Sequence, residues 1–453
     1  MPRSKAWIAV IRGLIQPYDR RRQDAVNKVW NQLPVHTQAP SQVLGTFSAG
    51  CAATHGIHER CDFGCTACYL PKTANLMKPM PLDAVFEQLR VIREHLGPGG
   101  NVQLTSGEVT LLPANELAQV VAKSRELDLS PMLMTHGQNL LDDPSYLKHL
   151  TDAGLTKVCF HVDTHQRGRR GIPRPQNEGQ LLYVRNAIAE LLTTHHKENG
   201  RRIKAASSLT ITAENAPELP EIIDWFLDKA PAFRLLSLQP VAEVGRTKHR
   251  GSSADDVWTQ VNRYFGRNID PHAFWFGHKA CSKIAVFMVV KTTRERFEWE
   301  AVRSGFPMDR AFFDRAIETF RGVVINDQPF PIAASRIVGA MIRRPLFLLH
   351  AVIYGIRRLW QQKKLVRKIL ASSWSKPFQT RAFPFAIVVH DFMSADQIET
   401  PLGQERVSAC AFKVPYKGEM VSMCAFNAMG HRQASYDESR SISDRASCSE
   451  ATV

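Results

Sequence analysis

The sequence of 453 residues lacks features that mark several classes of protein. No charge-free apolar run reaches the roughly 18 residues that a membrane-spanning helix needs. Nine cysteines in so long a chain do not form the disulfide framework of a small secreted protein. The first apolar stretch is interrupted by Arg12 and has no small-residue cleavage site, which excludes a signal peptide. These absences predict a cytoplasmic chain with reduced thiols, and no internal repeat of fixed period is present.

Acidic residues are missing from one long segment. Between Gln328 and His390 there are eleven Lys and Arg but no Asp or Glu, whereas the net charge of the whole chain is +15. The remainder is therefore close to balanced, and no nucleic-acid partner is expected. The longest charge-free run in this segment, Pro345 to Ile356, has twelve residues. It is too short to span a bilayer but suits a helix in the headgroup plane, with basic side chains on anionic lipid. A helix packed on the rest of the protein and an RNA-binding stripe stay open as alternatives.

Between about Val43 and Gly245, short apolar or β-branched runs alternate with longer segments of helical period. Strands are predicted near Ala52–His58, Val102–Thr105, Met132–Thr135, Lys157–Val162, Ser207–Thr212 and Phe233–Gln239. Helices are predicted near Leu82–His95, Ala114–Leu127, Pro144–Ala153, Gln180–His195 and Ala216–Ala230. Strands separated by helices imply a parallel sheet, and six strands are too few for a closed eightfold barrel. The pattern predicts an α/β fold, a partial TIM-like (β/α)6 barrel, with its chemistry at the carboxyl ends of the strands.

After Gly245 the pattern changes to a mixed, largely helical C-terminal extension. It begins with an amphipathic helix at Ala254–Arg267 and includes a short β-like run at Phe383–Val389. The predicted segments are a basic amphipathic N-terminal segment (1–42), the barrel (43–245), a helical extension (246–327), the basic apolar segment with its candidate membrane-surface contact (328–390), a cysteine-containing segment (391–430) and a disordered, Ser-rich tail (431–453).

Three cysteines follow the first predicted strand, in Cys61-Asp-Phe-Gly-Cys65-Thr-Ala-Cys68. Thiolates at this spacing can surround one metal cluster from a single loop. A cubane cluster takes four ligands, so three protein ligands leave one iron open for an exchangeable group. A zinc site is the alternative, with His55 and His58 close enough in sequence to complete it. The position favours the cluster, because an α/β enzyme keeps its active site at the end of a barrel strand.

With these motifs the sequence resembles the radical S-adenosylmethionine (radical SAM) superfamily. The spacing of Cys61, Cys65 and Cys68 is that superfamily's cluster signature, and Ser106-Gly107-Glu108 after the second strand resembles its Gly-Gly-Glu motif. The resemblance covers about residues 43–245. One position departs from the pattern, since the residue before the last cysteine is usually aromatic and here is Ala67.

The resemblance implies a [4Fe-4S] cluster on Cys61, Cys65 and Cys68 whose open iron binds S-adenosyl-L-methionine. Reductive cleavage of that cofactor then gives a 5′-deoxyadenosyl radical that abstracts a hydrogen atom from substrate. Ser106, Gly107 and Glu108 are expected to bind its methionine end. His136, Asp163 and Gln239, at later strand ends, are expected to contact the rest of it. The electron is expected from an external one-electron reductant such as flavodoxin or ferredoxin.

Three downstream cysteines, Cys281, Cys410 and Cys424, together with a His or Cys51, could hold a second iron–sulfur cluster, or they are small buried hydrophobic residues. The segments Asp391–Met393 and Cys424–Asn427 faintly resemble the tetraether-lipid synthase branch of the superfamily, which joins lipid tails. That resemblance and the basic segment together favour a membrane lipid as substrate and a peripheral location on the inner face of the membrane. The alternatives are a peptide-modifying radical SAM enzyme with an auxiliary cluster and a non-catalytic iron–sulfur or zinc module.

Overall fold

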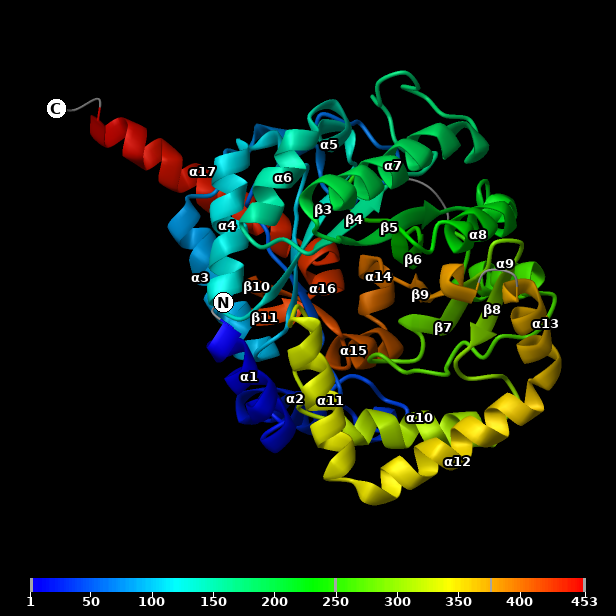
Figure 1. Cartoon of the computed structure of the whole chain (residues 1–453). Coiled ribbons are helices and arrows are strands. Elements are labelled where there is room, and N and C mark those ends of the chain that lie inside the picture. Colours follow the sequence, from blue (N-terminus) through cyan, green and yellow to red (C-terminus); the bar gives the residue numbers. More distant parts are fainter. Residues whose placement is uncertain (1–2, 248–250, 375–376, 451–453) are drawn as a thin grey trace.

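The strands of this chain join into one continuous sheet. The computed structural model describes residues 3–247, 251–374 and 377–450. Within them, eleven strands are ordered β11-β10-β1-β2-β3-β4-β5-β6-β9-β7-β8 across the sheet (Figure 1). Neighbours from β10 through β1 to β6 and on to β9 are parallel, whereas β11, β7 and β8 pair antiparallel to their neighbours. The sheet is therefore an open, partial barrel with added edges.

The six predicted barrel strands and their helices are confirmed. The strands are β1 Cys51–Ala53, β2 Asn101–Leu104, β3 Ser130–Thr135, β4 Lys157–His161, β5 Lys204–Ile211 and β6 Phe233–Pro240. The helices between them are α3 Leu82–Leu96, α4 Ala114–Glu126, α5 Gln138–Asp142, α6 Pro144–Asp152, α7 Leu182–Asn199 and α8 Leu219–Asp228 (Figure 1). Strand residues such as Val102, Leu133 and Val158 are fully buried, as expected for a parallel sheet covered by helices. β1 is shorter than predicted, because the chain after Ala53 already turns toward the cysteine loop.

The extension contributes strands as well as helices. The prediction that residues 246–327 are helical is wrong in part. α9 Ala254–Phe265 and α10 Pro307–Thr319 are helices, but β7 Ser282–Lys291 and β8 Arg296–Glu300 form a hairpin between them. The β-like run is β9 Arg381–His390, which lies between β6 and β7. Further along are α14 Ala395–Ile398, α15 Pro401–Ser408, β10 Phe412–Tyr416, β11 Glu419–Ser422 and α16 Met423–Ala428. β10 pairs with β1, so the extension completes both edges of the barrel sheet.

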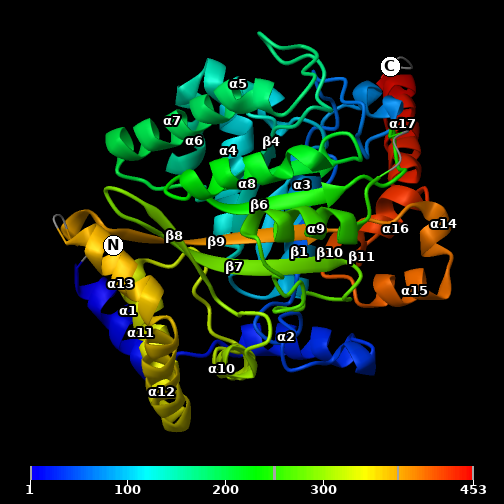
Figure 2. The same ribbon diagram turned by 90° about the vertical axis from the view of Figure 1, so that its right-hand side faces the viewer.

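Four helices follow one another across one side of the molecule (Figure 1 and Figure 2). They are the N-terminal α1 Arg3–Ile15 and the helices of the basic segment, α11 Phe330–Ile342, α12 Pro345–Gln361 and α13 Lys363–Ser373 (Figure 2). The remaining N-terminal helix is α2 Arg20–Gln32. Among the described residues no single helix has the length and apolar composition to cross a membrane. α11 and α12 have them only as a pair, which is bent by 103°.

The C-terminal tail differs from the prediction of disorder. Residues His431–Glu450 form α17, while 451–453 lie outside the described residues. The cause is one buried ion pair: the guanidinium of Arg432 lies 3.3 Å from both carboxylate oxygens of Glu59, and the Tyr436 hydroxyl donates to the same carboxylate at 2.5 Å. Arg432 and Tyr436 are buried. A polar composition suggested a solvated tail, but this tail has a buried partner in the barrel.

Candidate active site

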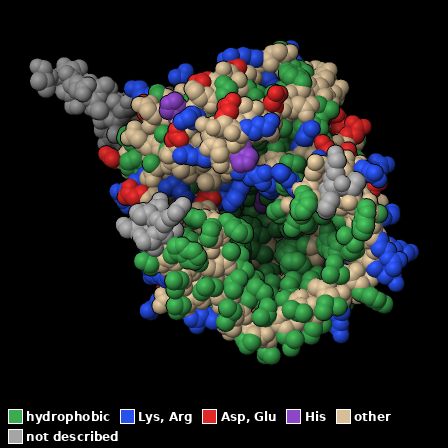
Figure 3. All heavy atoms as spheres, viewed as in Figure 1, with side chains coloured by type: hydrophobic (Ala, Val, Ile, Leu, Met, Phe, Trp, Pro, Cys, Tyr) green, Lys and Arg blue, Asp and Glu red, His purple; other side chains and the backbone are tan. Residues whose placement is uncertain are grey.

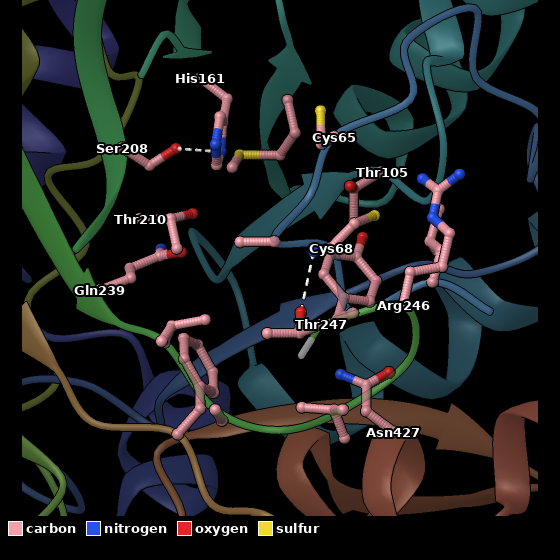
Figure 4. Close-up of a pocket in the computed structure, with 18 of the residues that line it drawn as sticks. Cys65, Cys68, Thr105, His161, Ser208, Thr210, Gln239, Arg246, Thr247 and Asn427 are labelled. Atoms are coloured by element: carbon pink, nitrogen blue, oxygen red, sulfur yellow. Dashed lines mark hydrogen bonds between the residues drawn. The ribbon is translucent and has the colours of Figure 1, made fainter. Parts of the chain in front are cut away.

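The three cysteines of the loop after β1 line one cavity at the carboxyl ends of the barrel strands. Backbone hydrogen bonds fix the loop: the Gly64 N–H donates to the Arg167 carbonyl, and the Thr66 N–H donates to the His165 carbonyl, both at 2.9 Å. The Cys68 N–H donates to Thr247 Oγ1 at 2.9 Å (Figure 4). Loops that follow three different strands therefore hold the cysteines, which is how a barrel positions side chains precisely.

These thiols need a cation to become thiolates. Burial raises the pKa of Cys61 well above its ordinary range and raises the pKa of Cys65 to about 12. Burial alone would lower the pKa of Arg246, but Cys68 and the other two cysteines outweigh it and raise that pKa. The Nε atom of Arg246 is buried and has no hydrogen-bond partner in the described part of the chain. The donor set therefore fits an anionic metal–thiolate group, since a bound metal deprotonates coordinating thiols.

The Ser106-Gly107-Glu108 segment also lines the cavity, and the backbone N–H groups of Gly107 and Glu108 donate to the carbonyls of His58 (3.0 Å) and Arg60 (2.8 Å) at the start of the cysteine loop. A Cβ atom on Gly107 would lie 2.2 Å from the Arg60 carbonyl oxygen and 2.3 Å from that of Glu59. The Ser106 Oγ accepts from the Gly56 N–H at 3.1 Å. Gly107 is thus required where the backbone enters the cysteine loop.

The Glu108 carboxylate is engaged within the protein. It accepts from the Thr135 hydroxyl at 2.7 Å, from the His136 N–H at 2.8 Å and from the Thr110 hydroxyl at 2.5 Å. Glu108 is 1% exposed. Glu108 therefore joins the ends of β2 and β3, and its expected contact with the methionine end of the cofactor stays a prediction.

His136 lies beside the cysteine loop, and its expected contact with the cofactor stays a prediction. Its ring stacks on Phe63, with 3.9 Å between centroids, and its Nε2 lies 2.8 Å from Asp62 Oδ1. Asp62, Cys61 and His136 offer ligand atoms within 4.8 Å of one another. His136 therefore closes the side of the cavity next to Cys61.

Asp163 does not line the cavity, contrary to the expectation of a ligand contact. Its carboxylate is fully buried, accepts from the backbone N–H groups of His165 (2.9 Å) and Thr210 (2.8 Å), and lies 2.6 Å from His161 Nε2. His161 is the residue that reaches the cavity instead. Burial alone would lower the pKa of His161, but the Asp163 carboxylate outweighs it and raises that pKa. The strand-end carboxylate thus orients an imidazole.

Polar side chains from β5 and β6 complete the far wall. Ser208, Thr210 and Gln239 face Cys65 and Cys68 across the cavity (Figure 4), and the Ser208 hydroxyl lies 3.3 Å from His161 Nδ1. Gln239 was expected here. Ser208 and Thr210 were missed, although they alternate with the fully buried Leu209 and Ile211, which is the period of a strand with one polar face.

The extension closes the cavity with a largely apolar wall. Its cavity-lining residues are Phe392, Met393, Phe412, Met423, Cys424 and Asn427. None of these was predicted as a site residue in this role. Phe392 and Met393 follow β9, which pairs with β6, and the others lie on or after β10, which pairs with β1, so only long-range strand pairing brings them to the cavity. The zinc alternative finds little support in His55, whose Nε2 lies 2.9 Å from the Pro415 carbonyl oxygen.

The downstream cysteines lie within electrostatic range of one another. Burial raises the pKa of Cys281 to about 11 and that of Cys424 to about 12, and Cys410 adds to both shifts. The Arg406 guanidinium donates to Cys281 Sγ at 3.3 Å. Cys51, the other candidate ligand, lies within electrostatic range of Lys157 and Arg22 instead.

Comparison with known proteins assigns one part of the chain to a family. Residues 57–226 match the model of the radical SAM superfamily. A curated relative, GTP 3′,8-cyclase 1 of Pseudomonas aeruginosa, is 26% identical over 211 residues, which cover 44% of this chain and 58% of the relative. The chain thus spans little more than half the length of that relative.

Solved structures with a similar arrangement include anSMEcpe with bound AdoMet (16% identity, 48% of this chain and 57% of that one, TM-score 0.35). Another is SuiB of Streptococcus suis bound to the precursor peptide SuiA (15% identity, 54% and 49%, TM-score 0.36). From the match of residues 57–226 and the cysteine loop that they contain, we conclude that this part of the chain is a radical SAM domain.

Proposed function

We propose that Cys61, Cys65 and Cys68 hold a [4Fe-4S] cluster that binds S-adenosyl-L-methionine, and that the enzyme removes a hydrogen atom from a membrane lipid. The observation that carries this proposal is a single cavity: the three thiols, the polar ends of β2–β6 and an apolar wall from the extension all line it. Such a combination suits a polar cofactor beside an apolar substrate.

The chemistry follows from the cluster's open iron. A cluster held by Cys61, Cys65 and Cys68 would, when reduced, supply one electron to the sulfonium of S-adenosyl-L-methionine. Cleavage of the S–C5′ bond would give methionine and a 5′-deoxyadenosyl radical, which would take a hydrogen atom from a substrate C–H bond and become 5′-deoxyadenosine. As in the superfamily generally, the electron comes from an external reductant, for which we propose a flavodoxin or ferredoxin.

Different residues of the cavity wall are available to the cofactor and to the substrate. The hydroxyls of Ser208 and Thr210 and the amide of Gln239 are available to the polar nucleoside and methionine parts of the cofactor. The Arg246 guanidinium is available to its carboxylate. Phe392, Met393 and Phe412 exclude water from the opposite wall and leave a surface that a hydrocarbon chain can contact.

A second iron–sulfur cluster on Cys281, Cys410 and Cys424 is the further part of this proposal. Their mutual electrostatic influence supports it, and Cys424 also lines the main cavity. A cluster there would lie at the apolar wall, close to substrate. We further propose that the protein works at the inner face of the membrane, on the cytoplasmic side, where its basic segment meets anionic lipid.

Anaerobic reconstitution tests the catalytic proposal. With reductant, the wild-type protein should release 5′-deoxyadenosine from S-adenosyl-L-methionine, and Cys65→Ala should release none. Cys159→Ala is the matched control, because Cys159 is buried within β4 and does not line the cavity. Protein that contains zinc and no iron would contradict the proposal and favour a non-catalytic metal module. Deuterium transfer into 5′-deoxyadenosine from a perdeuterated phospholipid tests the substrate, and transfer from peptides only would favour peptide modification.

Iron and sulfide quantitation tests the second cluster. One [4Fe-4S] cluster corresponds to roughly four irons per chain and two clusters to roughly eight. Cys410→Ala and Cys424→Ala should each remove about half of the iron but keep the cluster that Cys61, Cys65 and Cys68 bind. Unchanged iron content in both variants would refute the second cluster and leave the first intact.

A further inference from the structure

We propose that α1, α11, α12 and α13 together form one docking surface for an anionic lipid bilayer, here called the four-helix surface. The inference deepens the proposed function, on whose lipid substrate it rests, and it adds a part that the basic segment does not contain: the N-terminal helix. Most of the exposed large hydrophobic side chains of the described residues belong to these four helices and the turn after α13.

Small residues join α1 to α11. A Cβ atom on Gly13 would lie 2.2 Å from Ser335 Oγ, and one on Gly339 would lie 2.6 Å from the Leu14 carbonyl oxygen. The Arg343 guanidinium hydrogen-bonds to the Ile15 carbonyl. Because small residues form the contact between α1 and α11, the large hydrophobic side chains of α1 point away from α11. The outward residues of α1 are Trp7 (69% exposed), Ile8 (66%), Ile11 (52%) and Ile15 (59%).

α12 is oriented the opposite way from an ordinary surface helix, because its hydrophobic side faces away from the protein. Its inner side packs on α10: the Tyr354 ring stacks on Phe312 with 4.1 Å between centroids, and the buried Arg358 pairs with Asp309. Its outer side is hydrophobic and exposed, with Leu346, Leu349, Val352, Ile353, Ile356, Leu359 and Trp360. A contiguous exposed apolar face of this size marks an interaction site.

The charges at the four-helix surface select the occupant. None of the four helices contains Asp or Glu. Exposed cations flank the apolar residues, namely Arg12, Arg343, Arg344, Arg357, Lys363, Lys364, Arg367 and Lys368. Two copies of this chain would bring like charges together, which opposes self-association. An anionic bilayer offers both a hydrocarbon boundary and negative headgroups, so it matches the surface in both respects.

The arrangement in space agrees with this partner. Figure 2 shows α1, α11, α12 and α13 at one side of the molecule, and Figure 1 shows that they follow one another across it, from α1 through α11 and α12 to α13. Figure 3 shows hydrophobic side chains gathered over the α11–α12 arm and around a hollow beside it. Because α11 and α12 are bent by 103°, the pair presents an edge that can enter the headgroup layer without spanning it.

Vesicle flotation of the full chain tests the proposal. The probes are vesicles of phosphatidylcholine with phosphatidylglycerol and vesicles of phosphatidylcholine alone. Wild type should bind the anionic vesicles, and the triple variant Arg357→Glu, Lys364→Glu and Arg367→Glu should partition about a hundredfold more weakly. The pair Trp7→Asp and Ile11→Asp in α1 should also weaken binding at least about tenfold. Leu402→Asp is the matched control, since Leu402 is 53% exposed on α15 outside the four-helix surface and should leave binding unchanged.

Release of 5′-deoxyadenosine in the absence of lipid separates this test from that of the proposed function. A protein that cleaves S-adenosyl-L-methionine but does not float with anionic vesicles overturns the docking surface alone. A protein that floats but releases no 5′-deoxyadenosine overturns the proposed function alone. A wild-type oligomer that the Trp7 and Ile11 substitutions dissociate, without any vesicle binding, would assign the surface to self-association and refute the bilayer. Binding that the α1 pair leaves unchanged would refute the role of the N-terminal helix.

Discussion

At the scale of single residues, Gly107 shows why the cysteine loop tolerates little change. Its Cβ position is taken by the carbonyl oxygens of Glu59 and Arg60, which are backbone atoms and cannot rotate away. We expect Gly107→Ala to destabilise the fold by about 1–3 kcal/mol, as overpacking does, and to lower iron incorporation. Gly64→Ala is the matched control in the same loop, because a Cβ there meets nothing within 4 Å. Chemical denaturation and iron analysis of the two variants check this; equal losses would contradict it.

The His161–Asp163 pair gives a pH dependence whose sign follows from its two shifts. The folded pKa of Asp163 lies below its ordinary value of about 4, and that of His161 lies above its ordinary value of about 6.5. The contribution of this ion pair to the free energy of unfolding is therefore fully present between the two ordinary pKa values, about 4 and about 6.5. It is lost as pH falls through the lowered pKa of Asp163 or rises through the raised pKa of His161.

We expect Asp163→Asn to reduce the free energy of unfolding most near pH 5–6 and progressively less above the folded pKa of His161. The substitution should also lower that pKa, which NMR titration of the imidazole measures directly. Ser208→Ala is the control, because it removes only the neutral partner at 3.3 Å. A stability difference that does not vary with pH would show that the pair is not charged in the folded protein.

At the scale of elements, α17 anchors the start of the cysteine loop. Removing a buried charged partner leaves the other charge unpaired, which costs about 3–5 kcal/mol. Arg432→Met should therefore destabilise the protein by about that amount and loosen the loop, since Glu59 lies two residues before Cys61. The Tyr436→Phe variant loses one hydrogen bond and should cost about 1 kcal/mol.

Two further variants make the α17 test decisive. Lys417→Ala removes an exposed ion pair to Glu438 at 2.9 Å and should change stability very little. Combining Arg432→Met with Glu59→Gln should recover part of the loss, because it removes the uncompensated charge. Thermal unfolding of these four variants beside the wild type checks both expectations. If the double variant shows no recovery, the packing of Arg432 on Phe426 and Tyr69 matters more for stability than its charge.

At the scale of the whole molecule, the proposed cluster joins loops that the sheet alone leaves separate. The cysteine loop contacts the loop after β4 through Gly64 and Thr66, and the loop after β6 through Cys68. Removal of iron by a chelator should increase amide hydrogen exchange in these three loops, while the buried strands β2–β5 keep their protection. Uniform loss of protection across the sheet would contradict this division.

Much of the fold could be predicted from the sequence, because it depends on local patterns. Apolar runs at strand period and helices between them determine a parallel barrel, and the spacing of Cys61, Cys65 and Cys68 requires only that one loop curl. The helical period of α12 is likewise visible in the sequence. What the period does not reveal is which side faces the protein, because a contact such as Tyr354 with Phe312 joins separate segments.

The tertiary structure alone decided the features that depend on distant partners. A buried Glu59 turns a polar tail into α17, and the pairing of β10 with β1 brings Phe412 and Cys424 to the cavity. Asp163 points into the protein because backbone N–H groups and His161 surround it, which no local pattern records. The sequence by itself determined the chemistry of the cysteine loop and the order of the barrel. Long-range packing determined which side chains share the cavity and which helices share a surface, because burial and charge pairing are properties of the folded chain.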